Sequence, residues 1–321
     1  MDEISKLAPV VSVAMITYNQ ERFITRAIES VLTQQTTFPI ELVIGEDASS
    51  DDTRRHIEAF RGRAPEVIRT LFRPANIGMH RNLEEVLEEC RGEFIAFLEG
   101  DDYWTSTDKL QTQVDILRKR VDLVGIHHPV RWVDALDREV GGDTYLKVER
   151  EEGTRELLEH NVVATASVMM RRDALPSLPD SFRKLDMRDW PMWVFASLRG
   201  GWLYVPKVMA AYRLHDGGSW GRLSWGAQLD SMIRLFDTFV AELPRPFSVI
   251  ARQQLIRLHL QAVEEALACG RPIDARRELR DLVRLLPYFR MSDSSALWRT
   301  LSPRTHRAVR RILRHIGEKL A

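Results

Sequence analysis

The sequence predicts an α/β protein with a Rossmann-like, mixed but mostly parallel sheet, followed by a helical C-terminal region. Across residues 10–98, short apolar runs rich in β-formers alternate with amphipathic helical patterns. Such alternation is typical of parallel strands joined by right-handed helical crossovers. From residue 223 onward the apolar residues recur at helical spacing. A chain of 321 residues is long enough for one large α/β domain with an appendage.

Charge and cysteine content exclude several classes of protein. Lys plus Arg and Asp plus Glu both number 46, so bulk attraction to nucleic acid is not expected. Cys90 and Cys269 lie far apart, each in an apparent helix, which argues against a disulfide framework and fits a reducing cytosol. The sequence shows no secretory signal and no apolar run of membrane-spanning length. We therefore expect a cytoplasmic protein.

Four strands are expected in the first part of the chain, each ending in a polar loop. They cover residues 10–16, 41–44, 67–72 and 94–98. The helices between them cover residues 23–34, residues 54–60 and a stretch with Leu83, Val86 and Leu87. Asn19 is expected to be the N-cap residue of the first helix.

The pattern changes after Asp108. The expected elements are a helix at 109–118, extended segments at 123–127, 130–133, 162–170 and 202–205, and an apolar helix that ends at Leu198. Two helices around the turn at 269–272 then form an αα-hairpin. The final stretch has an apolar stripe and crowded arginines, which fits either an anionic membrane surface or packing on its own domain or a second subunit. Peripheral membrane contact and homodimerisation therefore both stay open.

The strand ends indicate where a ligand binds. Thr17, Asp47 and Asp101 each follow a predicted strand, and ligands of open α/β sheets bind outside the carboxyl ends of the strands. Glu99, Asp101 and Asp102 end the apolar run that starts at Phe94. Carboxylates at such an edge can hold a hard divalent cation together with substrate phosphates. The alternative is that the two aspartates cap the helix that begins near Thr107.

The same segments resemble the motifs of a known enzyme family. Val11–Asn19, Gly45–Asp51 and Glu99–Asp102 are similar to three successive motifs of family 2 glycosyltransferases, which are inverting, nucleotide-sugar-dependent enzymes of the GT-A fold. Asp189–Trp190 and Tyr212–His215 resemble the later, acceptor-side motifs of that family. The resemblance covers residues 9–220 with all five motifs in the expected order.

Two departures from the family pattern leave donor identity open. The family usually has Asp-Asp-Gly-Ser where this chain has Glu46-Asp47-Ala48-Ser49. It also has Asp-x-Asp where this chain has Glu99-Gly100-Asp101. Both departures keep the carboxylates and lengthen one side chain.

The resemblance implies roles for individual residues on the donor side. It implies Mn²⁺ or Mg²⁺ bound by Asp101, Asp102 or both, and a hydrogen bond from the nucleobase to Asp47, for which an Asx turn is the alternative. Arg81 is either a phosphate ligand or a solvated surface residue. Trp104 is expected in the core rather than in the pocket wall. The remaining expected donor and substrate contacts are Thr17, Tyr18, Asn19, Glu21 and Glu99.

On the acceptor side, Asp189 is the expected general base, because inverting transfer needs a carboxylate that deprotonates the attacking hydroxyl. Trp190 and Trp193 are expected to bound a sugar pocket and to raise the pKa of Asp189 by desolvation. The alternatives are that Asp189 is the N-cap of the following helix, or that Asp186 is the base. His215 is expected at the metal or diphosphate site, beside a glycine-containing loop that closes over the diphosphate.

These expectations combine into one function and two alternatives. Residues 1–222 would form a GT-A domain with a donor half (9–108) and an acceptor half (109–222), followed by helices at 223–321. The domain would transfer a sugar from a nucleotide-diphosphate sugar to a sugar, lipid-linked or small-molecule acceptor in cell-surface glycan, glycolipid or natural-product biosynthesis. A sugar-1-phosphate nucleotidyltransferase would need a glycine-rich basic loop after the first strand. A non-catalytic nucleotide-sugar-binding scaffold would not need Asp189 and His215.

Overall fold

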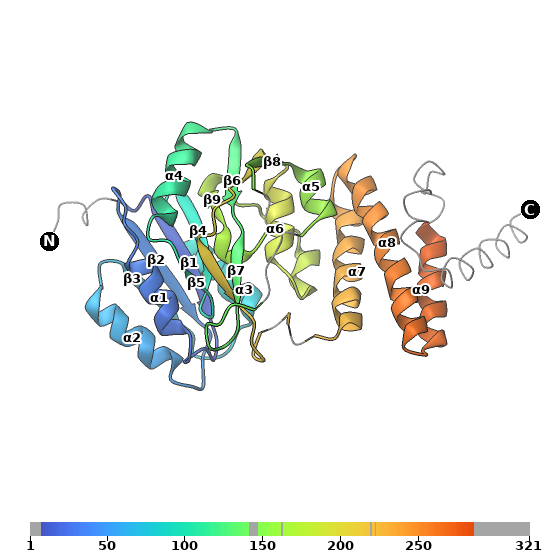
Figure 1. Ribbon diagram of the computed structural model, residues 1–321, viewed down its shortest axis with the longest axis horizontal. Helices are drawn as coiled ribbons and strands as arrows, with labels where there is room; N and C mark the ends of the chain where they lie inside the picture. Colours follow the sequence, from blue (N-terminus) through green and yellow to red (C-terminus); the bar gives the residue numbers. More distant parts are fainter. Residues whose placement is uncertain (1–7, 141–146, 162, 219, 222, 286–321) are drawn as a thin grey trace, which may run out of the picture. The chain divides into compact units, whose positions relative to one another are not determined.

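The computed structural model describes residues 8–140, 147–161, 163–218, 220–221 and 223–285 (Figure 1). The chain divides into two compact units. The first contains Met1–Leu178 and Arg188–Gly218, and the second contains Pro179–Met187 and Ser219–Ala321. The first unit carries every residue that the sequence places at the candidate site except Asp186.

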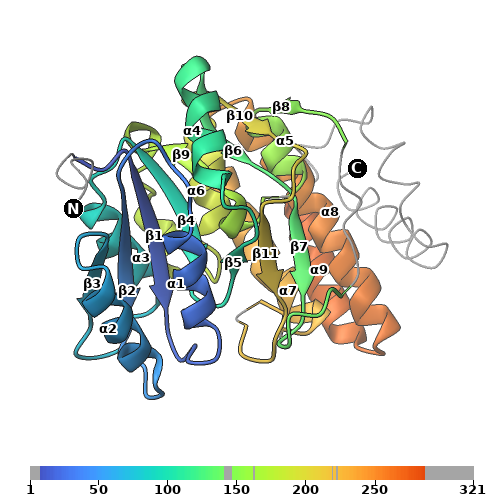
Figure 2. The ribbon, with the colours of Figure 1, turned by 60° about the vertical axis from the view of Figure 1, so that its left-hand side comes forward.

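An eight-stranded sheet forms the centre of the first unit, with strand order β3-β2-β1-β4-β9-β6-β10-β8. Its first half is parallel, as predicted, and consists of β1 (Val11–Thr17), β2 (Ile40–Glu46), β3 (Ile68–Phe72) and β4 (Phe94–Glu99). The connecting helices are α1 (Ile24–Leu32), α2 (Thr53–Arg63) and α3 (Met79–Glu89). Helices α1 and α2 cover one face of this half and α3 covers the other (Figure 2). Because both faces are covered, these strands are almost continuously apolar.

The second half of the sheet is mixed. It contains β6 (Leu123–His127), β8 (Arg150–Glu152), β9 (Met169–Arg171) and β10 (Gly201–Tyr204). Strand β9 runs antiparallel to both β4 and β6. A separate three-stranded sheet has the order β5-β11-β7, made of β5 (Tyr103–Trp104), β11 (Ala210–Arg213) and β7 (Val130–Val133). Helices α4 (Lys109–Lys119), α5 (Thr154–Glu159) and α6 (Asp189–Ala196) complete the unit.

Three local predictions are wrong. Residues 162–170 are not one strand, because the chain turns through a 3₁₀ segment at Thr165–Ser167, where the Ser167 hydroxyl donates to the Ala164 carbonyl (2.6 Å). Asn19 does not cap α1, whose N-cap position is Phe23. Asn19 instead has a left-handed φ of 52°. Cys90 and Cys269 each lie just past the end of a helix rather than inside one.

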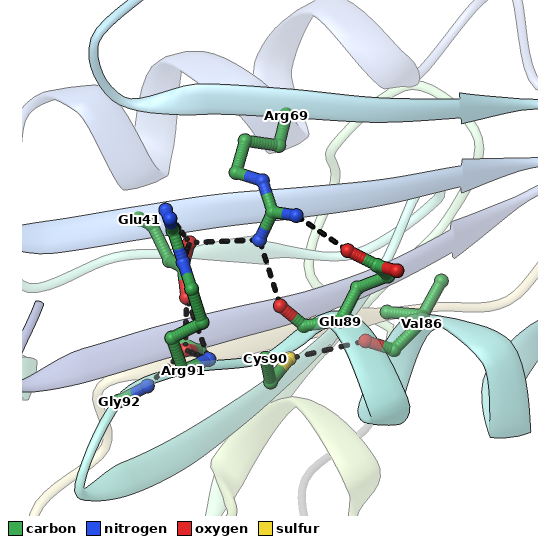
Figure 3. A network of polar contacts seen from close by, with 8 residues as sticks. Glu41, Arg69, Val86, Glu89, Cys90, Arg91 and Gly92 are labelled. Atoms are coloured by element: carbon green, nitrogen blue, oxygen red, sulfur yellow. Dashed lines mark hydrogen bonds and ion pairs between the residues drawn. The ribbon is translucent and has the colours of Figure 1, made fainter.

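A buried polar network holds the amino ends of the parallel strands together (Figure 3). Glu41 of β2 is 2% exposed and accepts hydrogen bonds from the Ser12 hydroxyl of β1 (2.7 Å) and the Arg91 amide before β4 (2.8 Å). The same carboxylate forms ion pairs with Arg91 (2.8 Å) and with Arg69 of β3 (3.2 Å). One carboxylate therefore joins four strands at the edge of the sheet opposite to the candidate site.

The second unit is helical, as the sequence predicts. Helices α7 (Trp225–Glu242), α8 (Phe247–Ala268) and α9 (Pro272–Leu285) pack in sequence order, so the predicted hairpin is confirmed as α8 and α9. The 3₁₀ segment Asp180–Lys184 packs on α7 through Phe182 and Phe239, whose ring centroids are 5.5 Å apart. No helix of the described part of the chain is long and apolar enough to cross a membrane. The predicted apolar stripe with its arginines lies outside the described residues.

Candidate active site

The carboxyl ends of β1 and β4 meet at Gly100. A Cβ atom at this position would lie 2.7 Å from the Thr17 hydroxyl and 2.5 Å from the Gln20 amide oxygen, so only glycine fits. Thr17 itself donates a hydrogen bond to that amide oxygen (2.7 Å). The acidic residues that follow β4 therefore lie directly beside the end of β1, as the strand pattern predicted.

Asp102 is a buried carboxylate with one unused oxygen. Its Oδ1 accepts the Arg213 amide of β11 (2.8 Å), and its Oδ2 has no hydrogen-bond partner among the described residues. Burial raises the pKa of Asp102 well above the usual value, and the charges of Asp101 and Glu99 raise it further. Neither aspartate caps α4, whose N-cap position is Asp108, so that alternative is wrong.

Asp101 is bound by two residues from the end of β11. Its Oδ2 lies 3.0 Å from His215 Nε2, and its carbonyl accepts Arg213 Nε (2.8 Å). The Gly217 amide donates to His215 Nδ1 (3.2 Å), which places the imidazole proton on Nε2, toward Asp101. Phe23 packs on the His215 ring at 4.8 Å. The structure therefore brings His215 to Asp101, as predicted, in a geometry that orients the carboxylate.

Glu99 and Asp189 complete a group of four carboxylates, which we call the acidic cluster: Glu99, Asp101, Asp102 and Asp189. Burial raises the pKa of Glu99 to about 8, and the charges of Asp101 and Asp189 add to this effect. Burial also raises the pKa of Asp189, although the Thr165 hydroxyl donates to it at 3.4 Å. Asp189 is the first residue of α6 and Arg188 is the N-cap, so the capping alternative is wrong.

Asp186, the competing base, belongs to the second unit. Its Oδ2 accepts hydrogen bonds from Ser231 and Arg234 of α7. Both contacts fix it in the helical unit.

Tyr212 lies at the site, although the sequence, which placed it in an acceptor-side motif, assigned it no role of its own. Burial raises the pKa of its hydroxyl, and the charges of all four carboxylates of the acidic cluster raise it further. Its ring lies 5.8 Å from that of Trp132, its register partner on β7. Alternation along β11 could have revealed it, because Tyr212 must face opposite to Ala211 and Arg213.

Asp47, the expected nucleobase contact, is held by backbone contacts. Both oxygens of Asp47, which is 3% exposed, accept backbone amides, from Ile77 (2.8 Å) and Gly78 (3.0 Å). These amides lie far along the chain, so the Asx-turn alternative is wrong. Arg81 extends from α3 with its side chain 69% exposed and pairs with Glu85 on the same helix (2.9 Å).

The loop after β1 is tied to the loop after β2. Asn19 Oδ1 accepts the Ser50 amide (2.8 Å), and a Glu21 oxygen accepts the Asp52 amide (2.9 Å). Tyr18 is 47% exposed beside them. Glu46, which departs from the family pattern, is fully buried and accepts Arg54 Nε (2.6 Å). The side chain of Glu46 is longer than the family's aspartate, and this length lets it bind Arg54 in the first turn of α2.

The three tryptophans for which the sequence suggested a pocket role are buried. Trp104 lies in the core as predicted, with its indole N–H donating to the Ala166 carbonyl (3.0 Å). Trp190 is 6% exposed and donates to the Leu157 carbonyl (2.7 Å). Trp193 is fully buried against Phe97 at 5.0 Å. The three indole rings are therefore held within the fold by their own packing and hydrogen bonds.

The acidic cluster fits a divalent cation that takes most of its ligands from the substrate. No three His, Cys, Asp or Glu side chains converge on one metal position within the described residues. Mg²⁺-type sites commonly use only one or two carboxylates and complete their coordination with phosphate and water. Asp101 and Asp102 provide such a pair, and the unpartnered Oδ2 of Asp102 is an available oxygen ligand.

Comparisons with known proteins agree with this geometry. Residues 12–178 match the model of Glycosyl transferase family 2. An uncharacterised protein of Mycobacterium tuberculosis is 37% identical over 209 residues, which cover 65% of this chain and 60% of the relative. The chain thus matches about three fifths of that relative's length. The Escherichia coli UDP-Glc:alpha-D-GlcNAc-diphosphoundecaprenol beta-1,3-glucosyltransferase WfgD is 34% identical over 110 residues, covering 34% of this chain and 42% of WfgD.

Solved structures share the fold at low sequence identity. Staphylococcus aureus TarS 1–349 in complex with UDP-GlcNAc superposes with a TM-score of 0.63 at 17% identity, covering 86% of this chain and 81% of TarS 1–349. The Pyrobaculum calidifontis mannosyltransferase PcManGT, in complex with GDP-Man and Mn²⁺, gives a TM-score of 0.58 at 16% identity, covering 95% of this chain and 86% of PcManGT.

Proposed function

This chain belongs to glycosyl transferase family 2, and from that premise we propose that it transfers a sugar from a nucleotide-diphosphate sugar to an acceptor hydroxyl with inversion and with the help of a divalent cation. The enzyme is a glycosyltransferase of the GT-A fold, so the nucleotidyltransferase and scaffold alternatives lose their support. The observation that carries the proposal is the acidic cluster, in which neighbouring carboxylates disfavour one another's ionisation and a cation would relieve the repulsion.

Asp101 and Asp102 would hold the cation. Asp102 offers its unpartnered Oδ2, while its Oδ1 and the Asp101 carbonyl stay anchored by Arg213. His215 orients the Asp101 carboxylate and becomes a direct ligand only by giving up its Nε2 proton. When bound, Mn²⁺ or Mg²⁺ would neutralise the charge that develops on the departing diphosphate.

Asp189 is the proposed general base. Its burial raises the pKa of the carboxyl group toward the operating pH, which favours proton abstraction in the transition state. Tyr212 stays protonated among the carboxylates, so its hydroxyl can donate a hydrogen bond to a sugar oxygen. No protein nucleophile is needed, because inversion requires only one displacement at the anomeric carbon.

The donor would lie across the loops after β1 and β2. Asp47 would accept a hydrogen bond from the nucleobase while backbone amides fix its position, and Thr17, Tyr18, Asn19 and Glu21 would line the base and ribose. TarS with UDP-GlcNAc and PcManGT with GDP-Man and Mn²⁺ support a nucleotide-sugar donor. Glu99 would face the sugar, whereas Arg81 would reach phosphate only by leaving Glu85.

The names of two relatives support a proposal for the cellular setting. WfgD and the Bacillus subtilis protein named putative teichuronic acid biosynthesis glycosyltransferase TuaG support a role in cell-surface polysaccharide assembly. We propose that residues 1–222 carry the reaction at the cytoplasmic side, and that the C-terminal region at 223–321 serves docking to a membrane surface or to a second subunit.

Asp189→Asn tests the assignment of the base, with Asp186→Asn as the matched control. The proteins are incubated with MnCl₂ and a panel of UDP-, GDP-, TDP- and CDP-sugars, and nucleoside diphosphate release is measured. We expect wild type and D186N to turn over one donor, and D189N to lose about 10²–10⁴-fold in kcat while still binding the nucleotide in a thermal-shift assay. Unchanged turnover in D189N, or loss only in D186N, would remove Asp189 from the mechanism.

A further inference from the structure

A second hollow of the first unit lies outside the acidic cluster. It has a volume of about 410 Å³ and runs along α1 beside the three-stranded sheet, lined by Arg26, Glu29, Thr33, Tyr103, Thr105 and Arg131 among others. This volume falls in the range of small-molecule sites, which is about 300–1,000 Å³. We call this hollow the α1 groove. Neither the family match nor the proposed mechanism uses it.

Guanidinium groups concentrate at the α1 groove. The Arg26 guanidinium lies 3.8 Å above the centre of the Tyr103 ring, and the Arg213 guanidinium lies 5.4 Å from the same centre. Arg131 also acts on the Tyr103 hydroxyl and makes only a loose ion pair with Glu139 (3.5 Å). Arg26 and Arg131 outnumber Glu29 among the charged residues that line the groove. The groove therefore has a net positive lining.

One carboxylate is shared between the groove and the candidate active site. Asp137 forms an ion pair with Arg26 and another with Arg213 (2.7 Å). Arg213 is also the residue that fixes Asp101 and Asp102. Phe23, one helical turn before Arg26, contacts both Arg213 (4.6 Å) and His215 (4.8 Å). The groove therefore begins about 5 Å, one turn of α1, from the residues that hold the acidic cluster.

The length of the groove suits a chain rather than a single small group. From Arg26 to Thr33 it follows α1 for about 10 Å at 1.5 Å per residue. Arginine side chains bind phosphate and carboxylate through paired N–H groups, and an aromatic ring beneath them adds an apolar surface. A ligand with anionic groups spaced along a polar chain would match both features.

We propose that the α1 groove binds an anionic group, phosphate or carboxylate, of the acceptor, so that the acceptor is an acidic polymer. This inference rests on the proposed function, because it takes the acceptor hydroxyl to lie at the acidic cluster. The anion would bind both Arg131 and Arg26. It would displace the Asp137 carboxylate from Arg26, and Asp137 would keep its ion pair with Arg213. Binding would weaken as ionic strength rises, because both cations are about half exposed.

Arg131→Glu tests the groove, and Arg118→Glu is its matched control. Arg131 and Arg118 are 50% and 47% exposed and pair loosely with Glu139 (3.5 Å) and Glu93 (3.6 Å), but only Arg131 lines the groove. Both side chains are exposed enough for either variant to fold, which circular dichroism checks. Titration calorimetry would use the full chain with MnCl₂ and saturating nucleoside diphosphate, so that the donor site is filled.

The probes are inorganic tripolyphosphate, tetragalacturonate and neutral maltotetraose. We expect wild type and R118E to bind at least one of the two anions, R131E to bind it at least tenfold more weakly, and maltotetraose to bind equally in all three. Tighter binding of tripolyphosphate would indicate that the acceptor carries phosphate groups. Tighter binding of tetragalacturonate would indicate that it carries carboxylates. Equal anion binding by R131E and R118E, or no anion binding by wild type, would overturn the inference.

The two proposals fail in different ways. Donor turnover without acceptor depends on the acidic cluster and not on Arg131. If nucleoside diphosphate release is normal while the anions do not bind, the groove inference fails alone. If the anions bind at the groove but no donor is consumed, the proposed function fails and the groove is an anion site of another kind.

Discussion

At the scale of single residues, Glu99 gives the site a pH dependence close to neutral pH. Burial, with the charges of Asp101 and Asp189, raises its pKa to about 8, whereas an unfolded chain has the ordinary value near 4.5. Between pH 4.5 and pH 8, the Glu99 carboxyl group is protonated in the folded protein and ionised in the unfolded chain. The contribution of Glu99 to the free energy of unfolding is therefore largest below pH 4.5 and falls as the pH rises toward 8.

Glu99→Gln should remove this slope in metal-free protein. At about 1.4 kcal/mol per pKa unit, wild type should lose a few kcal/mol between pH 5.5 and pH 8.5 that E99Q keeps. Thermal unfolding in EDTA at the two pH values measures the difference. Glu88→Gln, at an exposed position of α3, is the control and should behave as wild type. Parallel curves for wild type and E99Q would mean that Glu99 is ionised without a cation.

At the scale of secondary structure elements, the two edges of the parallel sheet differ in how their carboxylates are paired. The carboxyl edge holds carboxyl groups whose ionisation is disfavoured by burial and by their neighbours' charges, and on the proposed function a cation and a diphosphate relieve this. The amino edge holds Glu41, whose charge is matched by Arg69 and Arg91 (Figure 3). Because these networks lie at opposite ends of the strands, a change in one should leave the other intact.

Glu41→Gln should therefore lower stability without changing donor turnover. The substitution leaves Arg69 and Arg91 without their shared carboxylate and costs about 2 kcal/mol, less than a fully buried pair would because both arginines reach solvent. Urea unfolding and nucleoside diphosphate release, measured on one preparation, separate the two effects. Glu89→Gln, which removes only an exposed partner of Arg69, should cost less. A loss of kcat in folded E41Q would contradict this division.

The parallel half of the fold could be predicted because its signals are local. Apolar runs bounded by polar loops predicted β1, β3 and β4 to within about one residue, and strand order then placed Thr17 and Asp101 together. The prediction of one strand at residues 162–170 was wrong because part of this apolar run forms a 3₁₀ segment, in which the Ser167 hydroxyl donates to the backbone. Strand β11 was not predicted, and with it the direction of Tyr212, because this four-residue strand pairs only with strands distant in sequence. The burial of Glu46 and Trp190 also depends on distant packing.

At the scale of the whole molecule, the described residues of the candidate site provide too few side chains to complete the coordination of a cation. The described residues offer a cation the pair Asp101 and Asp102, and no group of three possible metal-binding side chains. The diphosphate must therefore supply the remaining oxygens. Cation and nucleotide should bind cooperatively, because each completes the site of the other.

This coupling is checked by measuring Tm in a thermal-shift assay under four conditions: without ligand, with Mn²⁺ alone, with nucleoside diphosphate alone, and with both. We expect each ligand alone to raise Tm by about 1 °C or less, and both together to raise it by several degrees, because only the joint complex pairs the buried oxygen of Asp102. Asp102→Asn should abolish the joint effect, since an amide gives up the negative charge that attracts the cation. Asp186→Asn, in the second unit, should keep it. A full shift with Mn²⁺ alone would mean that the protein completes the metal site by itself, with ligands beyond Asp101 and Asp102.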